Sequence, residues 1–149
     1  MNAPTPWLDA FLSGETNLSR MQHDLVLALG TRHYAEDRFS DAADLFRLAA
    51  LDRPESSRAW FSLASCHEAA DDVTRAASLY RLALAAPEDD GGKGRARLYL
   101  ARLLLAQGDR IEAESVLDAM TDDERDELAA DPELASSLAA VADRCRRPS

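Results

Sequence analysis

The residues in this sequence that could bind a metal or act in catalysis are few and scattered. Of the three histidines, His33 and His67 stand 34 residues apart, at one position of a repeated pattern, and His23 lies ten residues before His33. None has a cysteine or a second histidine at the spacing that would place two metal ligands on one helix face. We therefore interpret His33 and His67 as packing residues and predict no metal site.

The glycine-rich and cysteine-containing segments also lack the features of a catalytic site. Residues 91–94 contain a lysine between glycines but no following Ser or Thr, so they do not form a complete phosphate-binding loop. Cys66 and Cys145 have no Cys-x-x-Cys partner, which indicates two reduced thiols, and we expect Cys66 to act as a small buried hydrophobe. The sequence thus predicts a protein that is not an enzyme and uses no cofactor.

Composition limits the class of partner. The chain of 149 residues has 17 Lys plus Arg against 27 Asp plus Glu, a formal net charge of −10. Such a surface repels nucleic-acid phosphates and anionic lipid headgroups. The longest apolar stretch, residues 96–107, is interrupted by two arginines and is too short to span a bilayer, and the N-terminus lacks the pattern of a secretory signal. We expect a cytoplasmic protein that binds no nucleic acid and does not insert into membranes.

A repeat with a period of 34 residues determines the expected architecture. The recurring residues are Val26, Leu29, Gly30, Ala42, Phe46, Ala49 and Pro54, matched by Trp60, Leu63, Ala64, Ala76, Tyr80, Ala83 and, one residue early, Pro87. A weaker third copy, containing Leu100 and Ala101, lies 37 residues after the second, which puts a three-residue insertion into residues 88–94, expected to form a flexible loop. This period and pattern are typical of the tetratricopeptide repeat (TPR), a hairpin of two helices.

The sequence therefore predicts an all-α fold in which three TPR helical hairpins form a right-handed α-solenoid with flanking helices at both ends. Residues 1–18 are the N-terminal flank, residues 19–120 hold the repeats at about 23–56, 57–90 and 94–127, and residues 121–149 form C-terminal capping helices. The predicted helices of the hairpins cover 19–36, 40–51, 55–70, 72–85, 93–107 and 110–120. Gly30 is expected to let the first two helices approach closely, with Phe46 filling the space beside it.

The first helix of each hairpin is apolar on two sides, and its second stripe predicts a binding surface. Stacked in register, these stripes line one inner face, which suits an extended peptide better than a compact small molecule. The expected apolar anchors are Leu27, Tyr34, Phe61, Leu98 and Leu105, and the expected hydrogen-bonding groups are Thr31, Ser65, Glu68, Arg95 and Arg102. One or two of the anchors are expected to pack between neighbouring repeats instead.

Three segments carry a resemblance to a known family: residues 29–42, 45–52 and 108–115. They resemble the class II chaperones of bacterial type III secretion, the LcrH/SycD-like group, and the resemblance covers about residues 11–120. It implies a cytosolic chaperone that binds an extended apolar segment of a secreted translocator protein and keeps it soluble and competent for secretion. The sequence departs from the family at residues 50–52, where many members have an aromatic-rich end of the helix.

The resemblance also implies a homodimer formed through the N-terminal segment. The apolar residues available there at helical spacing are Trp7, Leu8, Phe11 and Leu12. The alternative for these residues is docking onto the first repeat of the same chain. For the whole protein, the alternative function is a general TPR adaptor or a co-chaperone subunit of the secretion apparatus. A clamp for a C-terminal carboxylate would be incomplete, because the inner stripes offer Arg58, Arg95 and Arg102 without Lys or Asn.

Overall fold

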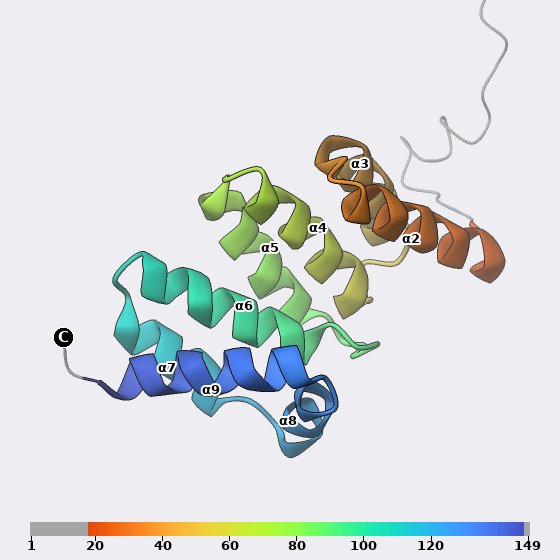
Figure 1. The fold of residues 1–149 in the computed structure, drawn as a ribbon. Helices are drawn as coiled ribbons and strands as arrows, with labels where there is room; N and C mark the ends of the chain where they lie inside the picture. Colours follow the sequence, from red (N-terminus) through yellow and green to blue (C-terminus); the bar gives the residue numbers. More distant parts are fainter. Residues whose placement is uncertain (1–17, 148–149) are drawn as a thin grey trace, which may run out of the picture.

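The computed structural model describes residues 18–147, and their regular secondary structure consists of eight helices (Figure 1). The helices are α2 (Arg20–Ala35), α3 (Phe39–Asp52), α4 (Ser57–Ala69), α5 (Val73–Ala85), α6 (Lys93–Ala106), α7 (Arg110–Asp118), α8 (Asp122–Ala129) and α9 (Pro132–Arg146). The predicted all-α fold is confirmed. None of the helices in this described part has both the length and the apolar character needed to cross a membrane.

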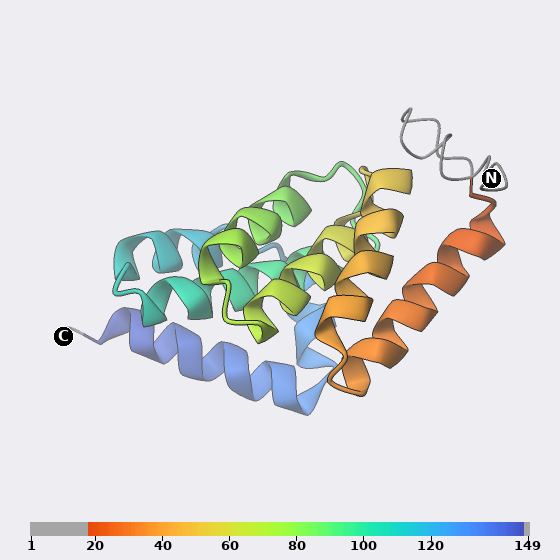
Figure 2. The same ribbon diagram turned by 90° about the horizontal axis from the view of Figure 1, so that it is seen from above.

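The helices pair as three consecutive hairpins, α2 with α3, α4 with α5 and α6 with α7 (Figures 1 and 2). The first helices also approach one another, since α2 contacts α4 and α4 contacts α6. Within residues 18–147 the second helices make no such contacts: α3 does not approach α5, nor α5 approach α7. The stack is therefore narrower on the side of the first helices, and this side forms its inner face.

Each hairpin turns through the same backbone geometry. Each hairpin turn contains one residue with positive φ, namely Asp37 (59°), Asp71 (63°) and Gly108 (85°), and these are spaced as the three sequence copies are. The next residue in each turn donates its N–H to a carbonyl of the preceding helix, five residues earlier, at 2.9 Å. A left-handed residue closed by this bond is a common helix C-cap. The recurrence shows that the degenerate third copy keeps the turn of the other two.

Small residues allow close packing within the first hairpin, as predicted for Gly30. A Cβ atom at Gly30 would lie 2.6 Å from Cε1 of Phe46, closer than side chains pack. Phe46 is buried, and Ala42 and Ala49 beside it on α3 are fully enclosed. The glycine thus makes room for the aromatic ring.

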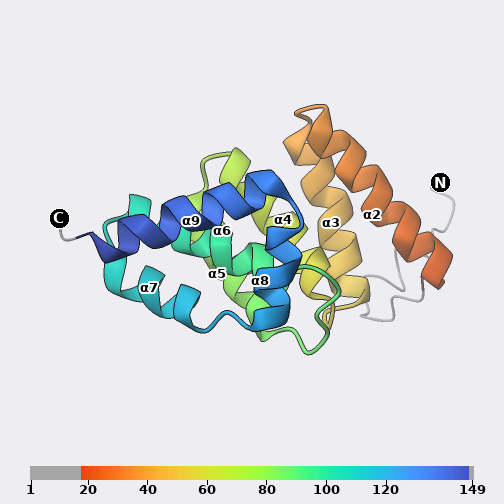
Figure 3. The same ribbon diagram turned by 60° about the horizontal axis from the view of Figure 1, so that its bottom comes forward.

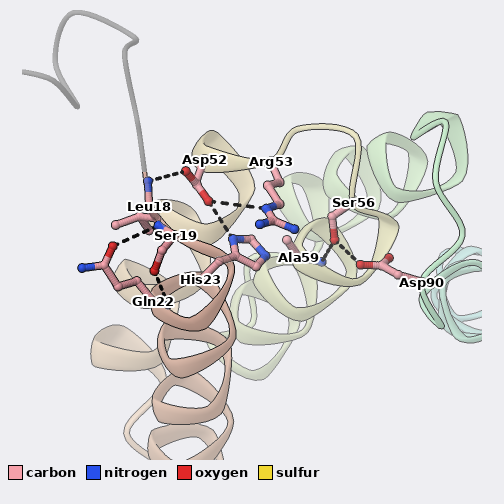
Figure 4. Close-up of polar contacts among 9 residues, drawn as sticks. All are labelled: Leu18, Ser19, Gln22, His23, Asp52, Arg53, Ser56, Ala59 and Asp90. Carbon is pink, nitrogen blue, oxygen red and sulfur yellow. Dashed lines mark hydrogen bonds and ion pairs between the residues drawn. The ribbon is translucent and has the colours of Figure 1, made fainter.

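The start of α2 is fixed by polar contacts as well as by packing. Ser19 and Gln22 form a capping box, in which each side chain accepts a hydrogen bond from the other residue's backbone. Asp52 at the end of α3 lies 2.8 Å from Nδ1 of His23, and both side chains are buried (Figure 4). Asp52 also accepts a bond of 3.4 Å from the backbone N–H of Leu18. This carboxylate therefore joins the end of α3 to the start of α2.

At the other end of the stack, α8 and α9 cover the third hairpin (Figure 3). Thr121 and Glu124 form a capping box, and Asp131 caps α9 with proline in its first turn. α9 packs against α6, α7 and α8. The apolar face of these two helices packs inward: Leu128 and Val141 are buried, and Leu134 and Leu138 pack against the core.

The loop between α5 and α6 is not the flexible insertion expected from the sequence. Its Glu88 exchanges backbone hydrogen bonds with a residue just before α4 and with the first residue of α4: Glu88 N–H donates to Glu55 O at 3.0 Å, and Ser57 N–H donates to Glu88 O at 3.1 Å. Gly92 packs so closely that a Cβ atom there would lie 2.6 Å from the carbonyl carbon of Ser57. The insertion is held in place because it pairs with backbone groups at the start of α4.

The predicted N-terminal elements cannot be placed. Trp7, Leu8, Phe11 and Leu12 lie outside the described residues, as does nearly all of the predicted N-terminal flank. Their role in dimerisation or in docking onto the first repeat stays a prediction.

Candidate functional site

A cavity of about 430 Å³ opens on the inner face of the stack. Its walls come mainly from the first helices α2, α4 and α6 and from the loop before α6. We call this site the inner cavity, and its lining residues are Thr31, Tyr34, Phe46, Arg58, Phe61, Ser62, Ser65, Asp90, Gly91, Arg95 and Tyr99. Its volume falls within the range of ligand-binding sites, and it is open rather than enclosed.

Aromatic side chains form the apolar part of the inner cavity. The rings of Phe61 and Tyr99 meet edge to face with centroids 5.1 Å apart, and Tyr80 lies behind both at 5.9 and 6.0 Å. On the α2 wall, Tyr34 is 37% exposed and contacts Phe39 edge to face at 5.1 Å. Edge-to-face contacts of this kind fix ring orientation. The cavity therefore offers preorganised aromatic surface.

A polar network supports this aromatic cluster at one end. Tyr80 Oη donates to one carboxylate oxygen of Glu68 at 2.8 Å, and Arg102 Nη2 donates to the other at 2.9 Å. The guanidinium of Arg102 also lies 4.5 Å above the Tyr99 ring. Burial raises the pKa of the Tyr80 phenol, so it stays a neutral donor at physiological pH. Glu68 and Arg102, expected as free groups for a peptide backbone, instead pair with each other.

The other end of the inner cavity carries Asp90. Its carboxylate accepts a hydrogen bond of 2.5 Å from the hydroxyl of Ser56 (Figure 4). It also accepts bonds from the hydroxyl of Ser57 at 2.9 Å and from the backbone N–H of Arg58 at 2.8 Å. Burial acts to raise the pKa of this carboxyl, but the hydrogen bonds from Ser56, Arg58 and Ser57 outweigh it and lower the pKa. Asp90 is therefore an anion held at the N-terminus of α4, where the helix dipole also favours it.

Half of the ten predicted binding residues line the inner cavity: Thr31, Tyr34, Phe61, Ser65 and Arg95. Glu68 and Arg102 join the network behind it. Leu105 does not line it and is partly buried against the core. The structure thus brings polar and aromatic residues of α2 and α4 together in one cavity, and their role in binding stays a prediction.

Two predicted anchors were assigned to the wrong face. Leu98 is fully enclosed, since α6 packs against α8 and α9 as well as its hairpin partner, and Tyr99 takes its place in the inner cavity. Leu27 is 5% exposed and belongs to the core, because α2 packs against both α3 and α4. Burial of one or two anchors was expected, but the identity of these two was not.

Sequence reasoning did not select Ser62, Asp90 or Tyr99. The rotation of α6 was hard to infer because Arg97 occupies the position of Trp60 in the preceding repeat. Arg97 is mostly buried and pairs with Glu124 of α8 at 2.8 Å. At this position of the third repeat, an ion pair to α8 therefore stands where the second repeat packs the ring of Trp60. The only sequence signal for Tyr99 was its aromatic side chain beside a misassigned leucine.

The surroundings of Cys66 and His67 in α4 shift the pKa of both side chains. Cys66 is buried, and burial raises the pKa of its thiol to about 12, which opposes formation of a nucleophilic thiolate. Burial lowers the pKa of His67, whose Nδ1 lies 3.9 Å from a carboxylate oxygen of Asp72. Across residues 18–147, no group of three metal-ligating side chains comes together.

Comparison with known proteins supports the repeat assignment. The sequence matches the family described as tetratricopeptide repeat over residues 27–92, that is, most of the first two hairpins. The comparison with curated proteins gave no match.

Solved structures share the fold over nearly the whole chain. A type III secretion complex from Aeromonas hydrophila is 22% identical with a TM-score of 0.68, over 95% of this chain and 93% of the other. The Yersinia enterocolitica secretion chaperone SycD, bound to a peptide of the translocator YopD, is 23% identical with a TM-score of 0.64, over 83% and 94%. The TPR2B domain of yeast Sti1, in a complex with pHsp70, is 16% identical with a TM-score of 0.68, over 84% and 96%. At these identities, the likeness establishes a shared TPR solenoid fold.

Proposed function

We propose that this protein is a type III secretion chaperone that binds an extended apolar segment of a translocator protein in its inner cavity. The observation that carries the proposal is the open cavity with a preorganised aromatic wall on the inner face of the repeats. The SycD structure, of similar fold, holds a translocator peptide. The sequence resemblance over residues 11–120 points to the same group.

The inner cavity suits an extended chain for physical reasons. It is open, so a chain can run across it, and it alternates aromatic surface with side-chain hydroxyls from Thr31, Ser62 and Ser65. Apolar side chains of a client would pack on Tyr34, Phe61 and Tyr99. Covering such side chains keeps a membrane-active protein from aggregating before its export.

Copurification from the native host tests the proposal. The tagged full-length chain should retain a protein with long apolar segments, identified by mass spectrometry. Tyr34→Ala should weaken client binding by about 1 to 3 kcal/mol, the range for a buried aromatic contact. Its melting temperature should change little, since Tyr34 is partly exposed. Retention of the client at full affinity by this variant would contradict the site assignment.

Phe61→Ala and Trp60→Ala provide the matched comparison. Phe61 lines the inner cavity but also contacts Tyr80 and Tyr99, so its loss should weaken both binding and stability. Trp60 does not line the cavity; it packs on the core and donates from Nε1 to Pro54 O at 2.8 Å. Its loss should lower stability first. Equal melting losses at both positions without a selective binding defect at Phe61 would count against the proposed site.

The second candidate function is a general TPR adaptor. It is favoured by the TPR2B domain of Sti1, which superposes as well as the secretion proteins do. A client without long apolar segments, or a stable complex with the secretion apparatus itself, would support this alternative.

A further inference from the structure

Two arginines of the inner cavity have no partner in the free protein. Nine arginines of residues 18–147 form ion pairs with carboxylates. Arg58 and Arg95 both line the inner cavity, yet neither side chain forms an ion pair or a hydrogen bond within the described residues. Both residues are exposed, so their guanidinium groups are open to solvent at the cavity. Other arginines of the described part, such as Arg20 and Arg144, also lack a partner, but they do not line the cavity.

The positions of these two arginines do not stabilise the free protein. Arg58 lies in the first turn of α4 and Arg95 in the first turn of α6. A cation there opposes the helix dipole, which favours negative charge at an N-terminus. The two residues stand 37 apart, the spacing between the second and third repeat copies, so they occupy equivalent positions on the inner face.

The nearby carboxylate is already occupied. Asp90 is the one acidic residue that lines the inner cavity, and its oxygens accept bonds from Ser56, Ser57 and the backbone of Arg58. Neither the side chain of Arg58 nor that of Arg95 forms an ion pair with it. At the far end, Glu68 and Arg102 neutralise each other. Both guanidinium groups therefore keep their donors available.

We propose that Arg58 and Arg95 form a carboxylate subsite, which selects peptide segments carrying Asp or Glu beside the apolar residue that packs on the aromatic wall. This inference rests on the proposed peptide-binding function and adds the chemistry of the client. Arg is suited to the task because its planar guanidinium binds a carboxylate through two parallel hydrogen bonds. The aromatic wall supplies apolar contact, and the arginines fix the position and direction of the segment.

The subsite also determines what the cavity rejects. A client with Lys or Arg at this position would place like charges together beside desolvated aromatic surface, which costs binding energy. An uncharged Asn or Gln would leave the guanidinium groups with weaker partners. The subsite thus distinguishes an acidic-apolar segment from other apolar segments of the same size.

A peptide array with the full-length protein tests the subsite. The probes are extended peptides with one central Phe or Leu, in which each neighbouring position carries in turn Asp, Glu, Asn, Gln or Lys. We expect stronger binding of Asp or Glu than of Asn or Gln at one position, by about tenfold when the best pair is measured by fluorescence anisotropy. Raising the salt concentration should reduce the difference.

Substitutions assign the preference to the two arginines. Arg58→Gln and Arg95→Gln should each weaken binding of the Glu peptide more than binding of the Gln peptide, so the discrimination between the two peptides should fall. The melting temperature should change little, because neither side chain has a partner in the free protein. Arg75→Gln is the control, because Arg75 is an exposed residue of α5 that pairs with Asp72 outside the inner cavity.

The outcomes separate this inference from the proposed function. Equal binding of acidic and neutral peptides, or a preference that survives both substitutions, would overturn the carboxylate subsite while leaving peptide binding intact. Binding of none of the apolar peptides would overturn the proposed function itself.

Discussion

Asp90 shows how a single side chain can hold a loop against a helix. It comes from the loop before α6, and its hydrogen bonds go to the first residues of α4. Those residues include backbone N–H groups that have no partner inside the helix. The carboxylate therefore accepts a hydrogen bond from one of these free N–H groups, and it joins the second hairpin to the third.

Asp90→Asn should destabilise the protein at neutral pH and make its stability less sensitive to acidic pH. The folded state lowers the pKa of Asp90 below its usual 3.8, so folding favours the ionised form. The contribution of Asp90 to the free energy of unfolding is fully present above the pKa that this carboxyl has in the unfolded chain. It is lost as the pH falls through the lower pKa of Asp90 in the folded protein. Thermal melts between about pH 2 and pH 7 would show a smaller acid-side decrease in the variant.

Asp89→Asn is the neighbouring control for this experiment. Asp89 accepts only backbone bonds within its own loop, from Gly91 and Lys93 at 3.2 and 3.4 Å. An equal effect at both positions would show that general surface charge, rather than the contact with α4, explains the stability change.

Cys66 should resist alkylation until the protein opens. Its side chain is 2% exposed, so the reagent cannot reach the sulfur in the folded state. Burial also raises the thiol pKa to about 12, so little of the reactive thiolate forms. Iodoacetamide labelling of a Cys145→Ser chain should be negligible in buffer and should rise with denaturant in step with the loss of helical signal. Rapid labelling without unfolding would mean that α4 opens locally.

The residues of the inner cavity were predictable only where the repeat itself is regular. Phe61, Ser65, Thr31 and Tyr34 lie on helices with a clear pattern, and periodicity placed them correctly. Leu98 was misplaced because helix rotation depends on which neighbours enclose α6, and those neighbours are helices from the far end of the chain. Asp90 was missed since its role depends on a tertiary contact with residues more than 30 positions earlier.

At the scale of elements, the helices and their caps were predictable because their signals are local. The capping residues Ser19, Thr121 and Asp131 each act within their own first turn. The order of the loop before α6 was not predictable, because glycines and acidic residues in sequence resemble a solvated linker. In the structure, Gly92 allows close packing against Ser57, and Gly91 adopts a positive φ of 102°.

Gly92→Ala should be more destabilising than Gly94→Ala. At Gly92 the added Cβ would lie 2.6 Å from the backbone carbonyl carbon of Ser57, whereas at Gly94 it would lie 3.2 Å from Glu124 O. Neither glycine has positive φ, so the contacts alone distinguish them. We expect a loss of about 1 to 3 kcal/mol at Gly92, the usual cost of overpacking, measured by urea denaturation. Equal losses would imply that the loop moves away from α4 freely.

At the scale of the whole molecule, the two ends of the stack differ. The third hairpin is covered by α8 and α9, which bury its apolar face. The first hairpin has no such cover within residues 18–147, and α2 exposes three apolar residues spaced by four: Met21 (81%), Leu25 (56%) and Leu29 (39%). Residues four apart lie on one face of a helix, so these side chains form a single stripe. A solenoid requires a cap at such an end.

Removing residues 1–16 should uncover this stripe and increase the binding of the apolar dye ANS. The predicted N-terminal segment provides Trp7, Leu8, Phe11 and Leu12 at the spacing needed to cover an apolar helix face. Light scattering on the same shortened chain, beginning at Asn17, then shows whether the stripe is covered by the N-terminal segment of the same chain or of a second copy. A halved mass means that the segment of a second copy covers the stripe in a dimer, and an unchanged monomeric mass means that the segment docks onto its own first repeat.

Leu25→Glu tests whether the stripe is the receiving surface. Placed at the centre of the stripe, the charge should reproduce the change in mass or dye binding that truncation causes, because an ionised carboxylate cannot be buried against apolar side chains without a partner. Ile111→Glu is the control, since Ile111 is 82% exposed on α7 at the opposite end of the stack. If truncation changes neither the mass nor the dye signal, the N-terminal segment does not cover α2, and the stripe is free to bind another protein.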